Sequence, residues 1–219
     1  MNYLTLLKGV NLPRFDEDYK KLVLDRRHIW ENINQISESE VKDTIIEFLK
    51  RWKIRNVKRI VPTQLKEVLK ELSKHFHELR NSSLIDLDFN EKIDVDGQKK
   101  RVSEIIKEIY TQLTERVNGV GPTSASKIMH CIIPQLFMMW DEKIRNGYGY
   151  AGNAIGYLKF LRESQQILKS IIASYGRSPE DLCREASPTM NKTLTKLLDE
   201  YNHMKFTQKK DLPSPTEDC

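Results

Sequence analysis

The sequence predicts an all-α fold, and three observations carry the prediction. Apolar residues recur every three or four positions along most of the 219-residue chain, which is the period of a helix. Capping residues and prolines stand where these apolar stripes begin. A strand-like alternation is confined to one short stretch. Hydrophobic residues make up 39% and charged residues 31%, which is the balance of a globular protein rather than a disordered one.

The start signals place the helices in chain order. Ser37 and Glu40 have the spacing of a capping box and begin one helix. Pro62 suits the first turn of the next, because its missing N–H is not needed there. Apolar periodicity or an initial Ser-Pro pair predicts further helices at 101–116, 122–133, 153–175, from 178 onward and from 187 onward.

The strand-like stretch comprises residues 84–95. Ile85, Leu87 and Phe89 alternate there with polar residues, and the pair Asp96-Gly97 suits a hairpin turn. A small β-hairpin and an extended loop fit this pattern equally well.

Charge and cysteine content limit the class of protein. Lysine and arginine exceed aspartate and glutamate by 36 − 31 = 5. No apolar run reaches the ~18 residues of a membrane span, and the first residues lack the pattern of a secretory signal. Cys131, Cys183 and Cys219 are too few and too scattered for a disulfide scaffold. We therefore expect a cytoplasmic or nucleoid-associated protein that is not secreted and has no membrane partner.

One segment of the chain, residues 50–59, carries six basic residues and no acidic one. Such a run can neutralise the phosphates of a nucleic acid. It can equally be the solvated end of a helix and the loop that follows. The six residues are Lys50, Arg51, Lys53, Arg55, Lys58 and Arg59.

A glycine-rich turn separates two predicted helices at Gly119-Val120-Gly121. The glycines allow a tight turn with positive φ, while Val120 is expected to face inward. The backbone N–H groups of the turn and of the following helix would then be unpaired, and with the helix dipole they would form an anion site. The alternative is an ordinary turn between helices, because this motif is common.

The residues after the turn make the motif more specific. The segment Gly119–Gly121, Ala125 in the second helix, and Asp141 followed by Ile144 and Arg145 together resemble the helix-hairpin-helix superfamily of DNA glycosylases. A glycine-rich hairpin occurs in many DNA-binding proteins, whereas an aspartate at this distance after it is typical of the glycosylases.

The resemblance implies a two-lobed helical fold. Residues 37–136 would form a barrel lobe that ends in the helix-hairpin-helix. Residues 1–36 and 137–202 would form the second lobe, and 203–219 a flexible tail. Asp141 would lie at the mouth of the cleft between the lobes.

The activity that the resemblance implies is base-excision repair of duplex DNA by a monomeric hydrolase. A flipped base would lose its N-glycosidic bond while Asp141 stabilises the sugar cation or activates water. Simple N-capping by Asp141 is the alternative role. A helix-hairpin-helix protein without catalysis, and a helical interaction protein in which the turn is only a turn, are the competing hypotheses. The expected phosphate contacts are Gly119, Val120, Gly121, Thr123, Ser124 and Lys127.

Departures from the family pattern refine this expectation. Thr123 stands where bifunctional members carry the lysine that forms a Schiff base, so we expect no strand-cleaving lyase step. Lys127 lies one helical turn further on and could substitute, although contact with phosphate or solvent is the usual role of such a lysine. Only Cys183 and Cys219 follow Asp141, which excludes a four-cysteine iron–sulfur cluster. The histidines lack metal-ligand spacing, so we expect neither a metal nor a cofactor.

Three aromatic residues surround the candidate aspartate. Trp140 precedes it, and Tyr148 and Tyr150 lie in the glycine-rich segment that follows. They are candidates for a base pocket, because aromatic rings stack on flipped bases. The alternative is that all three pack within the protein.

Overall fold

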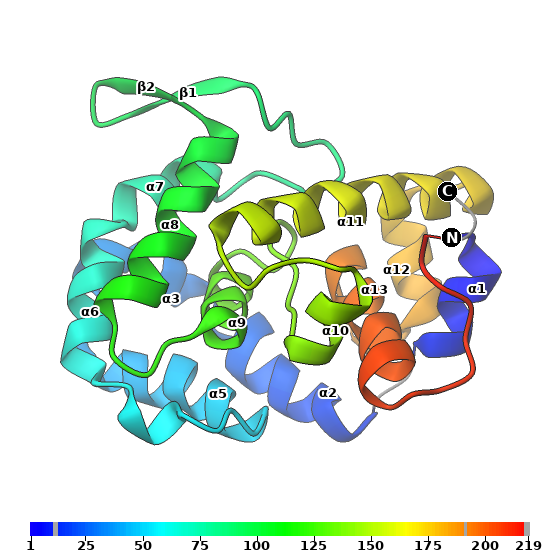
Figure 1. The fold of residues 1–219 in the computed structure, drawn as a ribbon, viewed down its shortest axis with the longest axis horizontal. Coiled ribbons are helices and arrows are strands. Elements are labelled where there is room, and N and C mark those ends of the chain that lie inside the picture. Colours follow the sequence, from blue (N-terminus) through cyan, green and yellow to red (C-terminus); the bar gives the residue numbers. More distant parts are fainter. Residues whose placement is uncertain (11–12, 191, 217–219) are drawn as a thin grey trace.

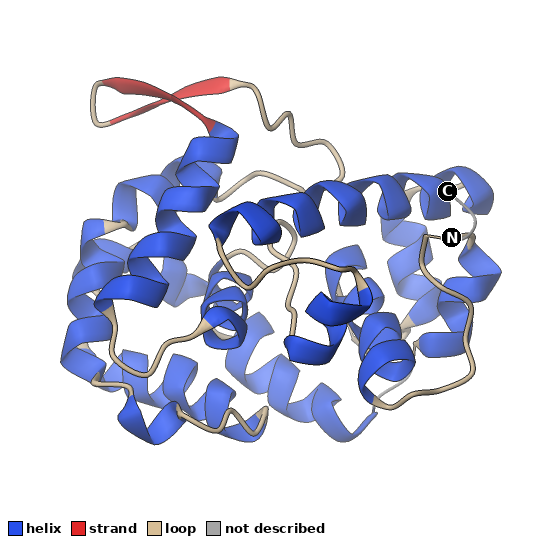
Figure 2. Ribbon diagram, viewed as in Figure 1, coloured by secondary structure: helices blue, strands red, loops and turns tan. Residues whose placement is uncertain are grey.

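The computed structural model describes residues 1–10, 13–190 and 192–216, and it confirms the all-α prediction (Figures 1 and 2). The helices are α1 (Tyr3–Gly9), α2 (Pro13–Tyr19), α3 (Arg27–Glu31), α4 (Glu38–Glu40), α5 (Glu47–Arg51), α6 (Pro62–Glu71), α7 (Ser73–Leu79), α8 (Val102–Arg116), α9 (Pro122–Ile132), α10 (Glu142–Gly147), α11 (Ala154–Tyr175), α12 (Pro179–Ala186) and α13 (Leu194–Asn202). Wider π-helical turns occur at Lys20–Leu24, Val41–Ile46 and His203–Thr207, and 3₁₀ turns at Ile33–Gln35 and Val57–Arg59.

Most of the predicted helix starts are confirmed. Ser37 and Glu40 form the reciprocal capping box, and α12 begins after Ser178, whose hydroxyl accepts from the Asp181 N–H. The start predicted after Ser187 is wrong. The Ser187 N–H ends α12 by donating to Cys183, and the next helix begins only at Leu194.

A β-hairpin forms, but it begins later than the alternation predicted. Strands β1 (Lys92–Val95) and β2 (Gln98–Arg101) pair in antiparallel register. The turn residues Asp96 and Gly97 have φ angles of 58° and 79°, which suit a two-residue hairpin turn.

Residues 84–86 form a turn rather than a strand. The buried amide of Gln165 on α11 donates to the carbonyl oxygens of Leu84 (2.7 Å) and Leu87 (2.8 Å). These bonds satisfy backbone groups that a sheet partner would otherwise have to pair. The alternating apolar residues are therefore held against α11 by a side chain.

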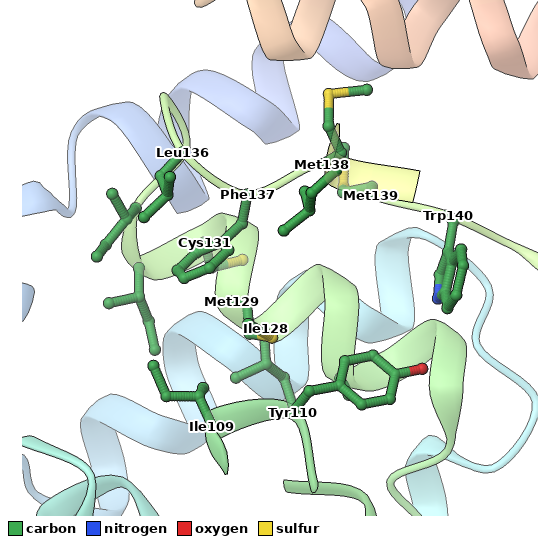
Figure 3. Close-up of a cluster of buried hydrophobic side chains, with 14 of the residues drawn as sticks. Ile109, Tyr110, Ile128, Met129, Cys131, Leu136, Phe137, Met138, Met139 and Trp140 are labelled. Carbon is green, nitrogen blue, oxygen red and sulfur yellow. The ribbon is translucent and has the colours of Figure 1, made fainter. Parts of the chain in front are cut away.

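Residues 136–140, in the loop that connects α9 to α10, belong to the core (Figure 3). All five of these residues are fully buried. Side chains replace a sheet partner along it, since the Tyr157 hydroxyl donates to Met138 O (2.8 Å) and the His130 Nδ1 lies 2.6 Å from Phe137 O. The segment is thus fixed between α9 and α11, and it places Asp141 near the N-terminal end of α9.

Part of the C-terminal segment 203–219, expected as a flexible tail, is helical or contacts the rest of the protein. Residues His203–Thr207 extend α13 by a helical turn, and the Tyr201 hydroxyl donates to Pro213 O (2.8 Å). Phe206 packs on α10, where a Cβ at Gly147 would lie 2.3 Å from its ring. Residues 217–219, including Cys219, lie outside the described residues.

The buried apolar side chains form one continuous cluster that includes residues of both expected lobes. The division at residue 136 therefore stays a prediction. Among the described residues, none of the helices has the length and apolar character needed to cross a membrane.

Candidate nucleic-acid interface

The turn between α8 and α9 is tight, and one of its two glycines, Gly119, has a positive φ. The Val120 N–H closes the turn on Val117 O (3.1 Å), and Val120 is buried. Gly119 has a φ of 82°, and a Cβ there would lie 2.9 Å from the backbone of Arg59 and Ile60. Gly121, in contrast, has a φ of −103°, so the tight turn uses a positive φ at Gly119 and not at Gly121.

The backbone donors at the start of α9 are unpaired. Gly121 is the N-cap and has no side chain to accept from the first turn. Within the described ranges, the N–H groups of Gly119, Gly121, Thr123 and Ser124 donate no hydrogen bond. A Cβ on Gly121 would meet nothing within 4 Å. The turn therefore offers open N–H donors at the positive end of an 11-residue helix, which is the geometry of an anion site.

Arg145 places a full positive charge beside this helix end. Its guanidinium carbon lies 5.9 Å from the centre of the Trp140 ring. A Cβ added to Gly152 would lie 3.2 Å from the Arg145 guanidinium and 3.2 Å from Pro122, the first residue of α9. Gly152 therefore lies beside both residues. No carboxylate within 4 Å of Arg145 is found in the described part of the chain. In the sequence, Arg145 supports the resemblance but is not among the predicted site residues.

Trp140 is a structural residue and not a pocket wall. It is fully buried among Tyr110, Tyr157 and Phe160. Its indole N–H donates to Pro122 O (3.1 Å), and its backbone N–H donates to Ser126 Oγ (3.2 Å). These bonds fasten residue 140 to α9, and so they fix Asp141 next to the hairpin.

Asp141 is half-buried and both of its carboxylate oxygens have partners. Oδ1 accepts from the Ile144 N–H (2.8 Å), which makes Asp141 the N-cap of α10. Oδ2 accepts from the Thr207 hydroxyl (2.7 Å) in the C-terminal segment. The capping role is therefore present, and a catalytic role would have to coexist with it.

Tyr148 and Tyr150 are tied into the protein by their hydroxyl groups. Tyr148 donates to Asn202 Oδ1 (3.0 Å), and Tyr150 donates to Glu163. Burial, together with the hydrogen bond to Glu163, raises the pKa of Tyr150 to about 12. The two rings lie nearly parallel with centres 6.5 Å apart. In this structure both tyrosines pack within the protein, which was the alternative to a base pocket.

Three of the expected phosphate contacts, Val120, Ser124 and Lys127, are buried. Ser124 is 3% and Lys127 8% exposed. The Lys127 Nζ lies 3.9 Å from the sulfur of Met139, and burial lowers the pKa of this amine. Lys127 thus does not reach a surface phosphate, and only the backbone N–H of Ser124 remains available.

A cluster of buried charges on and around α13 was missed by the sequence analysis. We call it the α13 charge cluster. The Lys192 Nζ lies 2.7 Å from Asp16 and 2.8 Å from Glu200, and the Lys196 Nζ lies 3.1 Å from Asp199 and 3.2 Å from Glu200. Burial alone would lower the pKa of Lys196, but the two carboxylates on its own helix raise it. The signal in the sequence was the spacing of three and four residues from Lys196 to Asp199 and Glu200.

Two surface cavities of about 350 Å³ lie elsewhere. One is lined by Lys20, Arg27 and Met190, and the other by Trp30 and Arg80, among other residues. Asp141 lines neither cavity.

No protein-family model matches the chain, and no curated protein or solved structure is significantly similar to it.

Proposed function

We propose that this protein is a helix-hairpin-helix DNA-binding protein. The single observation that carries the proposal is the row of unpaired backbone N–H groups at Gly119, Gly121, Thr123 and Ser124, with the Arg145 guanidinium beside them. N–H groups at the start of a helix bind anions, and a nearby arginine strengthens such a site through charge-assisted hydrogen bonds.

A phosphodiester of the DNA backbone is the anion that fits this arrangement. The groups present are backbone amides and one cation, which recognise phosphate oxygens and carry no information about base sequence. A Cβ built on Gly121 would meet no atom within 4 Å, so there is free space beside this residue for a phosphate oxygen. The net charge of +5 favours a polyanion as partner.

Base excision by Asp141 is the second candidate function. The observation that favours it is the position of a half-exposed carboxylate directly after Trp140, which is hydrogen-bonded to Pro122 and Ser126 of the hairpin. A carboxylate there would stabilise the cation that develops on the sugar as the bond from C1′ to the base breaks. Water would add to C1′, its proton passing to the carboxylate, and the base would leave with its bonding electrons. Thr123 has no amine and Lys127 is buried, so neither of these two positions supplies an amine for a Schiff base.

The test measures binding and base release on the same duplexes. A panel of duplexes, each with one lesion or mismatch, is titrated with the protein at several salt concentrations and then assayed for abasic sites. DNA binding predicts an affinity that falls steeply as salt rises. The absence of salt-dependent duplex binding would contradict both candidates.

Asp141→Asn separates the two candidates. Asparagine is as good an N-cap as aspartate, so the variant keeps the cap of α10 and the duplex affinity of the parent protein. If the protein is a glycosylase, base release falls by at least about 10² in this variant, while a borohydride-trapped adduct is absent in both. Base release that persists unchanged would remove Asp141 from the chemistry. Binding without base release in the parent protein would leave the DNA-binding function alone.

A further inference from the structure

The basic segment after α5 lies directly against the hairpin turn. A Cβ at Gly119 would be 2.9 Å from the carbonyl carbon of Arg59, and the Asn118 N–H donates to Gln64 Oε1 on α6 (3.2 Å). In Figure 1 this segment, between α5 and α6, lies beside the turn that joins α8 to α9. Residues about 60 positions apart in sequence therefore form one surface.

The backbone of this segment is held in a fixed conformation. Helix α5 ends in a Schellman motif, in which the Ile54 N–H donates to Leu49 O (3.0 Å) and the Lys53 N–H donates to Lys50 O (2.9 Å). Lys53 has the left-handed φ of 55° that this motif requires. The next turn is closed by the Arg59 N–H on Asn56 O (2.9 Å). The segment is thus preorganised.

The apolar residues of the segment point inward and leave its cations outside. Val57 and Ile60 are buried and Ile54 is half-buried, at intervals of three residues. The basic residues between them are exposed. Lys50 and Arg51 have Glu47 as an ion-pair partner, whereas the other four have no acidic partner in the described portion of the chain. These four are Lys53, Arg55, Lys58 and Arg59.

We infer that the exposed cations of residues 53–59 form a second phosphate-contact surface that continues the hairpin site along the backbone of the same duplex DNA. The inference rests on the proposed DNA-binding function. The alternative interpretation of the basic residues was a solvated helix end and loop. The inference instead assigns them duplex DNA as a partner, at the surface beside the hairpin turn.

A duplex fits this surface better than a single strand does. Proteins that bind single strands combine cations with exposed aromatic rings on which unpaired bases stack. The aromatic residue of this segment, Trp52, is instead half-buried, with its ring 4.0 Å from that of Phe48 and 5.5 Å from that of Phe15. A rigid surface of cations without a stacking platform is suited to the regularly spaced phosphates of a duplex.

The test compares two pairs of lysine or arginine residues at opposite ends of α8. One variant is Arg55→Gln/Lys58→Gln, next to the hairpin turn. The control is Lys92→Gln/Lys99→Gln on the β-hairpin, which precedes the other end of α8. All four side chains are exposed, and each variant removes two positive charges. Duplex affinity is measured by fluorescence anisotropy over a range of salt concentrations, with a single strand of the same sequence in parallel.

We expect the Arg55/Lys58 variant to bind duplex more weakly, with a plot of log affinity against log salt that is shallower by about 1.8, since each neutralised phosphate contributes about 0.9. The Lys92/Lys99 control should retain the parent slope. Equal losses in both variants would reduce the effect to net charge, and an unchanged slope in the first would overturn the inference while the hairpin function stands. Tighter binding of the single strand would overturn the choice of duplex. A parent protein that binds no DNA would refute the proposed function itself.

Discussion

At the N-terminal end of α9, polar groups are open and unpaired, whereas along α13 they are buried and paired with one another. Gly121 and Thr123 present backbone donors that have no acceptor among the described residues. Lys196 and Glu200 are 3% and 0% exposed and lie 3.2 Å apart. The difference teaches which polar groups are available to a ligand. Charges that are paired with one another inside the protein cannot bind a ligand, whereas unpaired donors at the surface can.

The largest effect on stability is expected from breaking ion pairs of the α13 charge cluster. Glu200→Gln removes the carboxylate that lies 2.8 Å from Lys192 and 3.2 Å from Lys196, and so breaks one buried ion pair of each lysine. Such a change costs about 3–5 kcal/mol in the free energy of unfolding. Urea denaturation followed by circular dichroism measures it. The control is Glu38→Gln, whose ion pair with Lys42 is exposed to solvent and therefore contributes little to stability. Similar losses in the two variants would show that the α13 charge cluster is solvated.

The second largest effect is expected at Gly119, in the turn between α8 and α9. Gly119→Ala forces a Cβ into a position 2.9 Å from the backbone of Arg59 at a φ of 82°, and we expect a loss of about 2–3 kcal/mol. The control is Gly97→Ala, with a similar φ of 79° and nothing within 4 Å, so it measures the backbone cost alone, about 1–2 kcal/mol. Urea denaturation of both variants gives the difference. An equal loss would mean that the contact with Arg59 contributes nothing.

The buried side also predicts a dependence of stability on pH. His130 is fully buried, with Nδ1 donating to Phe137 O (2.6 Å) and Nε2 accepting from the Tyr19 hydroxyl (2.9 Å). Burial lowers the pKa of His130 from 6.5 to about 4. Because the unfolded chain then binds the proton more readily than the folded one, this stability is complete above pH 6.5 and is lost as the pH falls toward 4.

Unfolding experiments near pH 7.5 and pH 5 should differ by about 2 kcal/mol through this residue. In His130→Gln the overall stability is lower, but most of this pH dependence should disappear. A parent protein whose stability is constant between the two pH values would contradict the neutral, buried state of His130.

What the sequence could predict follows from how far apart the interacting residues lie. The capping box of Ser37 and Glu40, the Asp96-Gly97 turn and the positive φ of Gly119 involve neighbours within a few residues, so local patterns revealed them. The all-α class follows from helical periodicity in the same way. The DNA partner and the catalytic role of Asp141 stay predictions.

The parts that the sequence did not reveal depend on distant contacts. Thr207 bonds to Asp141 from 66 residues away, and Arg59 meets Gly119 across 60 residues. Helix α13 reads as a half-exposed helix with charges at favourable spacing, yet all nine of its residues are buried, because α1, α11 and α12 pack around it. Lys127 and Trp140 were given surface roles for a similar reason, since periodicity states which residues share a face and not what covers that face.

Substitution of Gly121 gives the sharpest test of the unpaired N–H donors at the start of α9, although its expected effect on stability is the smallest. Its φ is extended and a Cβ would meet nothing within 4 Å, so the fold itself does not require glycine at this position. Gly121→Ala should therefore cost at most about 1 kcal/mol, the difference between the two residues as N-caps. The added methyl group occupies the space through which a phosphate would reach the amides, and losing one charge-assisted hydrogen bond of about 1.5 kcal/mol weakens duplex binding about tenfold. Gly97→Ala supplies the opposite control, because it lowers stability and should leave duplex affinity unchanged. If Gly121→Ala binds duplex DNA as tightly as the parent protein, the open amides of the hairpin are not the phosphate site.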